Sequence, residues 1–483
     1  MMEEPVKRLP QTGIDRDEIL KRMGEYGATD ADWREARTWS LVYYLGEKHT
    51  AFLKKAYSLF FSENALNPMA FKSLKRFESE VVRMTATMLN GDSRVVGTMT
   101  SCGTESCLLA VKTYRDLARA KRPWIRKPEM VVPESVHVAW EKGAEYFDVK
   151  AIHAPLTKDF QVNVNAVRKL INRNTVLIGA SAPSYPHGMV DPIPELAALA
   201  REKNLPLHVD SCLGGFLLPF VEKLGYPVVP FDFRVPGVTS ISADVHKYGF
   251  AAKGASVILY RDMRILRHQF FVYENWPGGI FISPALLGTR PGGAIAAAWA
   301  AMMAIGESGY LDNAKRILDI TRKLIDGINT IPELYVLGNP PMSVFAYASR
   351  QKDVNIYAVA DQMEKKGWHV DRLHRPEALH AIVMPAHENI LGRYLDDLRE
   401  SVDYVKKNPE LATKGGAAMY GMISQIPLRG MVKSNVLKLM EDMYGSEARL
   451  PEFDEPEGVE ARPADLTTRL AMGFLKIRNR FRK

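Results

Sequence analysis

Between residues 60 and 310, short and almost continuously apolar runs alternate with longer segments in which apolar residues recur at helical spacing. Short apolar runs bounded by turn residues are typical of strands that are covered on both faces. The predicted strands are 130–132, 175–180, 206–209, 240–242 and 256–260, and the predicted helices are 104–121, 136–146, 162–171 and 192–203. This alternation predicts an α/β fold with a mostly parallel sheet, and a ligand site at the carboxyl ends of its strands.

The pattern also suggests how the chain is divided. Residues 60–310 form the large domain, and residues 1–59 form a segment that precedes it. Residues 311–430 are expected to form a smaller α+β domain, and residues 431–483 a tail. In the smaller domain we expect a long helix over 312–328 and strands near 334–337, 343–348 and 381–384.

The tail changes character along its length. Residues 446–465 are acidic and contain three prolines, which predicts an extended linker. In residues 466–483, apolar residues at helical spacing stand beside Arg and Lys, which predicts a basic amphipathic helix. Such a helix either docks its apolar stripe on the protein body or makes weak contact with an anionic membrane surface.

Composition narrows the class of protein. The chain has 483 residues, of which 46% are hydrophobic, and it is long enough for several cores. Its three cysteines form neither a disulfide framework nor a zinc motif, so no metal is expected. The net charge of +8 is modest, and no nucleic-acid partner is expected. The first residues lack the apolar core of a secretion signal, and the apolar stretch 294–305 is too short to span a bilayer. We therefore expect a cytoplasmic protein.

The first candidate for chemistry is the pair His246 and Lys247, which lies just beyond a short β-branched run and the strand predicted at 240–242. A lysine near the edge of a buried strand can be desolvated, and burial lowers the pKa of its amine, so that it attacks an aldehyde more readily. The alternative is an ordinary solvated lysine.

Three further motifs precede this pair. The sequence Thr-Ser-Cys-Gly-Thr-Glu-Ser at 100–106 opens a helix, where the N–H groups of Cys102, Gly103 and Thr104 either bind a phosphate or belong to an ordinary helix cap. Asp210 ends an apolar run and suits the partner of a protonated pyridine nitrogen or a capping residue in a turn. His137, at a helix start, either stacks on a flat ring or is partly exposed.

The order of these motifs resembles the fold-type I pyridoxal phosphate enzymes of the group II decarboxylase superfamily. The resemblance runs from about residue 40 to residue 420, and it is strongest to the lyases of that superfamily that cleave phosphorylated sphingoid bases. The motifs that carry it are 100–106, His137, 182–191, 208–215, 231–239, 240–249, 269–272, 288–293 and 419–422.

The resemblance implies a large domain of the aspartate aminotransferase type and pyridoxal 5'-phosphate as the cofactor. In it, Lys247 bonds to the cofactor, His137 stacks on the ring and Asp210 pairs with the ring nitrogen. The phosphate is assigned to Cys102, Gly103, Thr104 and His246, joined from the neighbouring subunit by Gly288, Thr289 and Gly292. A homodimer with shared active sites follows from that assignment.

The resemblance also implies residues for the substrate. Tyr44, Asn64, Lys253 and Tyr420 match positions that bind the substrate phosphate or transfer protons. There are two departures from the family pattern. Cys102 replaces a glycine, which matters little if backbone N–H groups do the binding. Asn67 replaces a histidine, and asparagine donates hydrogen bonds but does not transfer protons near neutral pH.

The implied reaction is a retro-aldol cleavage of a phosphorylated sphingoid base to a long-chain aldehyde and phosphoethanolamine. Lys253, Tyr44 and Lys247 are the candidates for proton transfer, without a ranking, and Lys253 alternatively binds the substrate phosphate. Eukaryotic members carry an N-terminal membrane anchor, and a soluble form without it is expected here. The alternatives are an amino-acid decarboxylase of the same superfamily and a non-catalytic protein that binds lipid or a partner.

Overall fold

The computed structural model describes residues 6, 8–425 and 429–446. Most of the predicted acidic linker and the whole predicted basic helix at 466–483 lie outside the described residues. Backbone contacts separate two compact units. One unit contains Arg34–Tyr347 and His380–Leu395, and the other contains Met1–Trp33, Ala348–Leu379 and Asp396–Lys483. The division of the chain into four segments, which the sequence suggests, remains a prediction.

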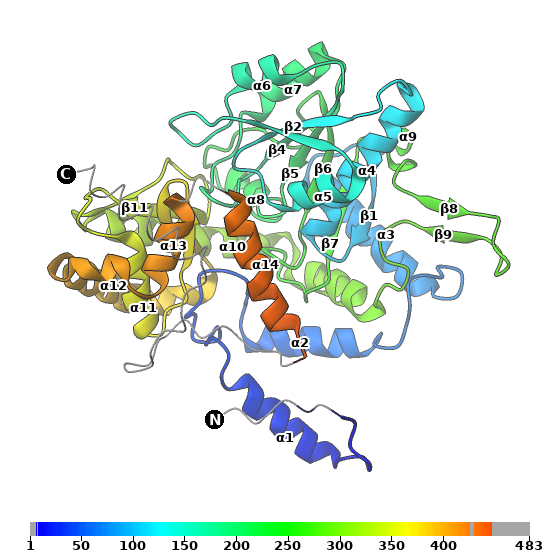
Figure 1. Ribbon diagram of the computed structural model, residues 1–483. Coiled ribbons are helices and arrows are strands. Elements are labelled where there is room, and N and C mark those ends of the chain that lie inside the picture. The colour runs from blue at the N-terminus through cyan, green and yellow to red at the C-terminus, as the bar shows by residue number, and fades with distance from the viewer. Residues whose placement is uncertain (1–5, 7, 426–428, 447–483) are drawn as a thin grey trace. The chain divides into compact units, whose positions relative to one another are not determined.

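A seven-stranded sheet forms the centre of the first unit (Figure 1), with the order β1-β7-β6-β5-β4-β2-β3. Strands β3, β2, β4, β5 and β6 are parallel, and β7 runs antiparallel to both β6 and β1. The mostly parallel α/β sheet is therefore confirmed. The strands are β1 (Val96–Thr100), β2 (Glu129–Pro133), β3 (Lys150–Ala154), β4 (Thr175–Ser181), β5 (Leu207–Asp210), β6 (Val238–Ala243) and β7 (Ser256–Tyr260).

Strands β1 and β3 were not predicted from the sequence, because neither is a continuous apolar run. Strand β3 lies at an edge of the sheet, and its residues before Ala154 are exposed or only partly buried. Strand β1 contains Gly97 and two threonines. A Cβ atom at Gly97 would collide with the carbonyl oxygen of Ile258, so the glycine permits the close pairing of β1 with β7.

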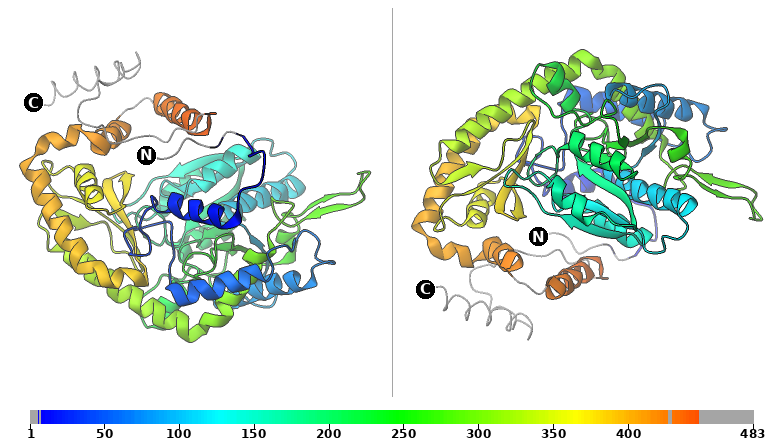
Figure 2. Two further views of the ribbon diagram at one scale, coloured as in Figure 1. Left: turned by 90° about the horizontal axis from the view of Figure 1, so that it is seen from below. Right: turned by 90° about the horizontal axis from the view of Figure 1, so that it is seen from above.

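Helices cover both faces of this sheet (Figure 2). Residues of α4 and α5 pack in one apolar cluster, whereas residues of α3, α7, α8 and α10 pack in another. The helices of this unit are α2 (Glu47–Ser58), α3 (Lys72–Met88), α4 (Gly103–Lys121), α5 (Ala139–Phe147), α6 (Val164–Leu170), α7 (Ile193–Glu202), α8 (Leu218–Lys223), α9 (Met263–Leu266) and α10 (Gly292–Asn329).

The helix expected over 312–328 is the second half of α10, which already begins at Gly292 and bends at Gly306, where φ is 61°. The prediction missed the first half because its alanine-rich pattern lacks helical periodicity. By length and hydropathy alone, α10 is long enough to cross a membrane. Half of its most apolar stretch is buried, and it packs against α2, α3 and α8, as a core helix does.

A two-stranded hairpin, β8 (Phe271–Tyr273) and β9 (Phe281–Ser283), projects from the first unit in all views (Figures 1 and 2). A separate four-stranded sheet has the order β10-β11-β13-β12. Its strands are β10 (Leu334–Val336), β11 (Val344–Ser349), β12 (Asp371–His374) and β13 (Glu377–Ile382). The strand predicted at 381–384 was therefore placed too late, because it begins at Glu377 among polar residues.

The second unit contains the N-terminal helix α1 (Arg16–Gly27) and a group of helices close to β12. Within it, α11 packs against α13, and the Asp361 carboxylate accepts a hydrogen bond from the Ala417 N–H (2.9 Å). The remaining helices are α11 (Ile356–Lys365), α12 (Leu391–Lys407, which begins in the first unit), α13 (Gly415–Gln425) and α14 (Arg429–Tyr444).

Candidate active site

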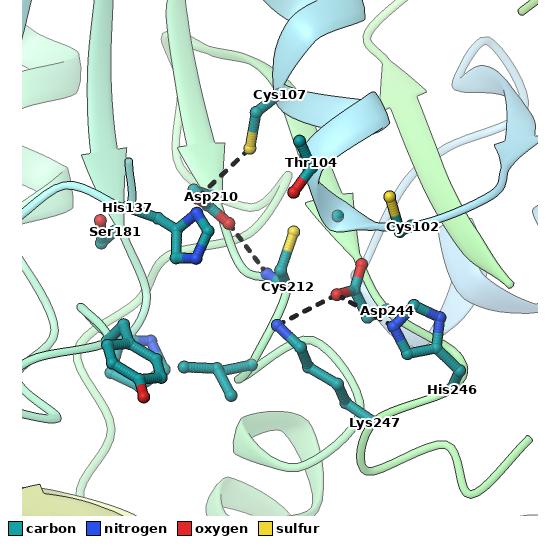
Figure 3. A pocket seen from close by; sticks show the side chains of 14 residues that line it. Cys102, Thr104, Cys107, His137, Ser181, Asp210, Cys212, Asp244, His246 and Lys247 are labelled. Atoms are coloured by element: carbon teal, nitrogen blue, oxygen red, sulfur yellow. Dashed lines mark hydrogen bonds and ion pairs between the residues drawn. The ribbon is translucent and has the colours of Figure 1, made fainter. Parts of the chain in front are cut away.

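A cavity of about 220 Å³ lies at the carboxyl ends of β4 and β5, beside the first turn of α4 (Figure 3). Ser181 and Asp210 end these strands as neighbours in register, and both line the cavity. The structure brings together seven residues that the sequence proposed for a cofactor, namely Cys102, Gly103, Thr104, His137, Asp210, His246 and Lys247. The rest of the lining consists of residues for which the sequence predicted no role, namely Cys107, Ser181, Pro183, Tyr185, Cys212, Leu213 and Asp244.

The first turn of α4 is packed closely against the cavity wall. The helix starts at Gly103, and a Cβ atom there would lie 2.6 Å from Asp244 Oδ2 and 2.8 Å from Cys212 Sγ. A larger residue would therefore have to displace the Asp244 and Cys212 side chains, and glycine permits the close approach. The first N–H groups of an α-helix have no partners within the helix, and the helix dipole favours an anion there. The turn therefore suits a phosphate group.

Asp210 is a buried carboxylate held by several donors. Its Oδ1 atom accepts a hydrogen bond from the Cys212 N–H (3.1 Å), and its Oδ2 atom accepts one from Trp140 Nε1 (3.2 Å). Burial by itself would raise the pKa of Asp210, but a hydrogen bond from the Cys212 side chain and the positive charges of His137, His208 and Lys247 hold it below its usual value. An ionised carboxylate at this place can keep a pyridine nitrogen protonated.

His137 stands two residues before α5 begins. Its Nδ1 atom accepts a hydrogen bond from the Ala139 N–H (3.1 Å), and its ring meets that of Tyr185 edge to face. Burial lowers the pKa of His137, so the imidazole is neutral near pH 7. A neutral flat ring on the cavity wall fits the stacking role that the resemblance implies.

Lys247 departs from the expectation that burial lowers the pKa of its amine. Its Nζ atom lies 3.1 Å from Asp244 Oδ2, in the turn after β6. Burial does favour the neutral amine, but the Asp244 carboxylate outweighs it and raises the pKa of Lys247 above its usual value. The expectation was wrong, because the sequence did not reveal the pairing with Asp244.

His246 lies on the other side of the same carboxylate. Its Nε2 atom is 3.7 Å from Asp244 Oδ2, and its Nδ1 atom accepts a hydrogen bond from the Ala255 N–H (3.3 Å). Burial lowers the pKa of His246 despite the nearby Asp244 charge. Asp244 thus contacts both members of the pair that the sequence singled out. Its position three residues before Lys247 was the signal available in the sequence.

Lys253 and Tyr43 form a second group near Lys247. The Lys253 amine donates a hydrogen bond to the Leu41 carbonyl (2.7 Å) and lies 5.0 Å from the centre of the Tyr43 ring. Although part of Lys253 is exposed, burial of its amine lowers its pKa to about 8. Burial also raises the pKa of Tyr43, which lies within electrostatic range of Lys247.

The structure places Tyr43, rather than Tyr44, next to the lysines. The Tyr44 hydroxyl donates a hydrogen bond to Glu47 (2.9 Å) at the protein surface. Consecutive side chains of an extended segment point in opposite directions. The resemblance implied Tyr44, and only the folded chain decides which of these two adjacent tyrosines faces inward.

The two asparagines proposed for the substrate hold turns in this chain. Asn64 donates a hydrogen bond to the Thr289 hydroxyl (3.2 Å) and accepts one from the Arg290 N–H (3.2 Å). Asn67 accepts hydrogen bonds from the N–H groups of Met69 (3.0 Å) and Ala70 (3.2 Å). Asn67 therefore acts as a cap at the position where a family histidine was expected to face the substrate.

The remaining proposed residues lie elsewhere. In the described part of the chain, the residues that line the cavity do not include Gly288, Thr289 or Gly292. This segment lies beside Asn64, which is hydrogen-bonded to Thr289. Tyr420 belongs to the second unit, on α13, where its ring lies 5.1 Å from the Arg372 guanidinium.

Comparison with known proteins identifies similar chains. The pyridoxal-dependent decarboxylase conserved domain matches residues 68–346. The sphingosine-1-phosphate lyase of Oryza sativa is 45% identical over 441 residues, which cover 90% of this chain and 81% of that protein. The solved Burkholderia pseudomallei sphingosine-1-phosphate lyase is 37% identical, with a TM-score of 0.82 over 91% of this chain and 98% of its own. A Lactobacillus brevis glutamate decarboxylase is 20% identical over 84% of this chain and 96% of its own, with a TM-score of 0.73, and so shares the fold.

Proposed function

Since this chain belongs to the pyridoxal-dependent decarboxylase family and, within it, to the sphingosine-1-phosphate lyases, we propose a specific assignment of roles to its residues. The protein is a pyridoxal phosphate-dependent aldehyde-lyase. It cleaves sphingosine 1-phosphate or a related phosphorylated sphingoid base into a long-chain aldehyde and phosphoethanolamine. One observation carries the assignment: Lys247, Asp210 and the first turn of α4 surround a single cavity.

The cavity fits the cofactor by the chemistry of its donors. Gly103 and Thr104 would hold the phosphate together with His246, Asp210 would hold the proton on the ring nitrogen, and His137 would lie against the ring. When bound through Lys247, the cofactor supplies an electron sink for the electron pair released as the C2–C3 bond of the substrate breaks. The ionised state of Asp210 and the neutral state of His137 support this assignment.

Cleavage requires a base that removes the proton of the C3 hydroxyl group and a donor that returns a proton at C2. We assign the base to Lys253, whose pKa of about 8 leaves part of its amine neutral near pH 7. Tyr43 stays protonated because its pKa is raised, so it is suited to donating a hydrogen bond or a proton. The contact between the Lys253 amine and the Tyr43 ring would keep the two groups close together.

The decisive experiment compares substrates. Purified protein with cofactor is incubated with sphingosine 1-phosphate, with glutamate and with aromatic amino acids, and the aldehyde, phosphoethanolamine and carbon dioxide are measured. We expect aldehyde and phosphoethanolamine in equal amounts. Carbon dioxide without aldehyde would instead identify an amino-acid decarboxylase. The likeness to glutamate decarboxylase supports a shared fold and not that activity.

A matched pair of lysine variants separates an enzyme from a non-catalytic binding protein. Lys247→Ala is expected to abolish both turnover and the cofactor absorption band. Lys223→Ala removes a surface lysine that pairs with Glu307 and is expected to leave both unchanged. Equal cleavage by the two variants would contradict the role of Lys247.

We further propose a homodimer in which residues 288–292 of one subunit reach the cofactor phosphate of the other. Support comes from the hairpin β8–β9, which directly precedes this segment along the chain. It exposes a group of large apolar side chains, Phe271, Val272, Tyr273, Trp276 and Ile282. Exposed apolar groups of this kind are typical of surfaces that a partner covers.

Sedimentation equilibrium tests the state of assembly, and Val272→Asp is expected to weaken the dimer. Shared sites are tested by mixing Lys247→Ala subunits with Thr289→Asp subunits, each inactive alone. A hybrid dimer contains one site without either change, so activity should return to a fraction of the wild-type value. Activity that stays absent although hybrids form would contradict sharing.

A cytoplasmic location and a weak membrane contact through residues 466–483 also remain proposals. Their basis is the sequence, since the described residues end at 446. Deletion of 466–483 is expected to reduce flotation with anionic vesicles while cleavage of a soluble short-chain substrate continues. Unchanged flotation would favour a tail that docks on the protein.

A further inference from the structure

Two thiols and a carboxylate meet at one end of the cavity. The ligand atoms of Cys107, Asp210 and Cys212 all lie within 4.8 Å of one another, and all three residues are buried. The Cys107 thiol lies 3.4 Å from Asp210 Oδ2, and both cysteines are free (Figure 3). Cys107 comes from α4 and Cys212 from the turn after β5, so packing rather than sequence proximity brings them together.

We propose that the cofactor-free protein binds a thiophilic divalent cation of the zinc type through Cys107, Asp210 and Cys212. Thiolate and carboxylate groups are ordinary zinc ligands. Zinc–sulfur and zinc–oxygen bonds of about 2.3 Å and 2.1 Å place the ligand atoms of a tetrahedral site about 3.6–3.8 Å apart. The observed cluster reaches that spacing with small side-chain movements, and water from the cavity can take the fourth position.

Binding of the cation and of the cofactor is mutually exclusive. The Asp210 carboxylate cannot ligate a cation while it pairs with a protonated ring nitrogen. This competition rests on the proposed function, whereas binding of the cation to the cofactor-free chain does not. A cation bound at this site therefore keeps the cofactor from binding to protein that does not yet hold it.

The cation must displace protons from both thiols. The hydrogen bond with Cys212 would lower the pKa of Cys107, but burial and the Asp210 carboxylate raise it to about 11, and the pKa of Cys212 is raised as well. Loss of two protons makes the affinity rise by about 100-fold per pH unit near neutrality. The other titratable groups around the cluster are Tyr43, His137, His208, Asp244 and Lys247.

Cobalt(II) provides a spectroscopic probe for this site, because thiolate ligands give it charge-transfer absorption and tetrahedral geometry gives it intense visible bands. Titration of cofactor-free protein is expected to give these bands with one cobalt ion per chain, and zinc should displace the cobalt. Cys107→Val removes one ligand while keeping an apolar side chain of similar size. It is expected to weaken the charge-transfer bands, because only the Cys212 thiolate remains, and to weaken binding by about 100-fold. Cys102→Ser is the matched control and should bind cobalt as the wild type does.

Three results would overturn the proposal. These are absence of cobalt binding to the wild-type chain, an unchanged spectrum and affinity in Cys107→Val, and an affinity that does not change with pH. A measurement on the wild type alone covers the case in which the variant does not fold: protein loaded with pyridoxal phosphate should bind cobalt only as cofactor is released. Cobalt binding without release of the cofactor would contradict the proposed competition, but not the binding of cobalt itself. Lyase activity, measured separately, reports on the proposed function whether or not cobalt binds.

Discussion

Asp244→Asn tests the electrostatic account of the lysine most directly. The Asp244 carboxylate is 1% exposed and its Oδ2 atom lies 3.1 Å from Lys247 Nζ. Asparagine keeps the shape of the side chain and removes its charge. Burial of Lys247, which favours the neutral amine, would then be opposed only by the smaller effects of Tyr43, Cys212 and Asp210.

The size of the effect follows from Coulomb's law. Two unit charges 3.1 Å apart interact by about 5 kcal/mol at an effective dielectric constant of about 20, which corresponds to about 4 pH units. The Lys247 side chain is 23% exposed, so water screens part of this attraction. We therefore expect the pKa of Lys247 to fall by about 2–3 units, towards its usual value.

The assay follows imine absorbance when cofactor-free protein is mixed with pyridoxal across the neutral and alkaline pH range. Pyridoxal lacks a phosphate, so a change in the phosphate site does not disturb the result. Only the neutral amine attacks the aldehyde, and the midpoint of the rate profile therefore reports the pKa of Lys247. Lys247→Ala should give no signal, and Asp262→Asn, a distant helix cap, should leave the midpoint unchanged. A midpoint for Asp244→Asn within about half a unit of the wild type would refute the reasoning.

Three other predictions concern single residues. If Lys253 is the base, kcat should rise as pH passes about 8, and Lys253→Met should remove that rise. An increase in KM alone at alkaline pH would instead show that the charge of Lys253 binds the substrate phosphate. Gly103→Ala places a methyl group against buried atoms, so thermal unfolding should show a loss of about 1–3 kcal/mol together with weaker cofactor binding. Gly392→Ala, in open space on helix α12, should lower neither stability nor cofactor binding. Tyr43→Phe should lower kcat by about tenfold or more and Tyr44→Phe should leave it unchanged; the reverse order would contradict the placement of Tyr43.

Local patterns in the sequence were sufficient for much of the fold. Short runs rich in apolar or β-branched residues and bounded by turns predicted β2, β4, β5, β6 and β7, because strands buried on both faces are mostly apolar. The order of the motifs around Gly103, Asp210 and Lys247 predicted the family, since each motif is short and needs no knowledge of distant neighbours. Edge strand β3 and the glycine-containing β1 lacked such a run, and they became strands by pairing with neighbours along the sheet.

The tertiary structure decided the electrostatics of the site. Sequence reasoning predicted an amine whose pKa is lowered by burial, but the fold of the turn after β6 sets Asp244 against Lys247 and reverses the direction of the shift. The same holds for Cys107 and Cys212, which lie far apart in the sequence and meet because α4 packs across the end of β5. Hydrophobic periodicity is a property of neighbouring residues, whereas a pKa depends on every charge within a few ångströms, and only the folded chain determines those distances.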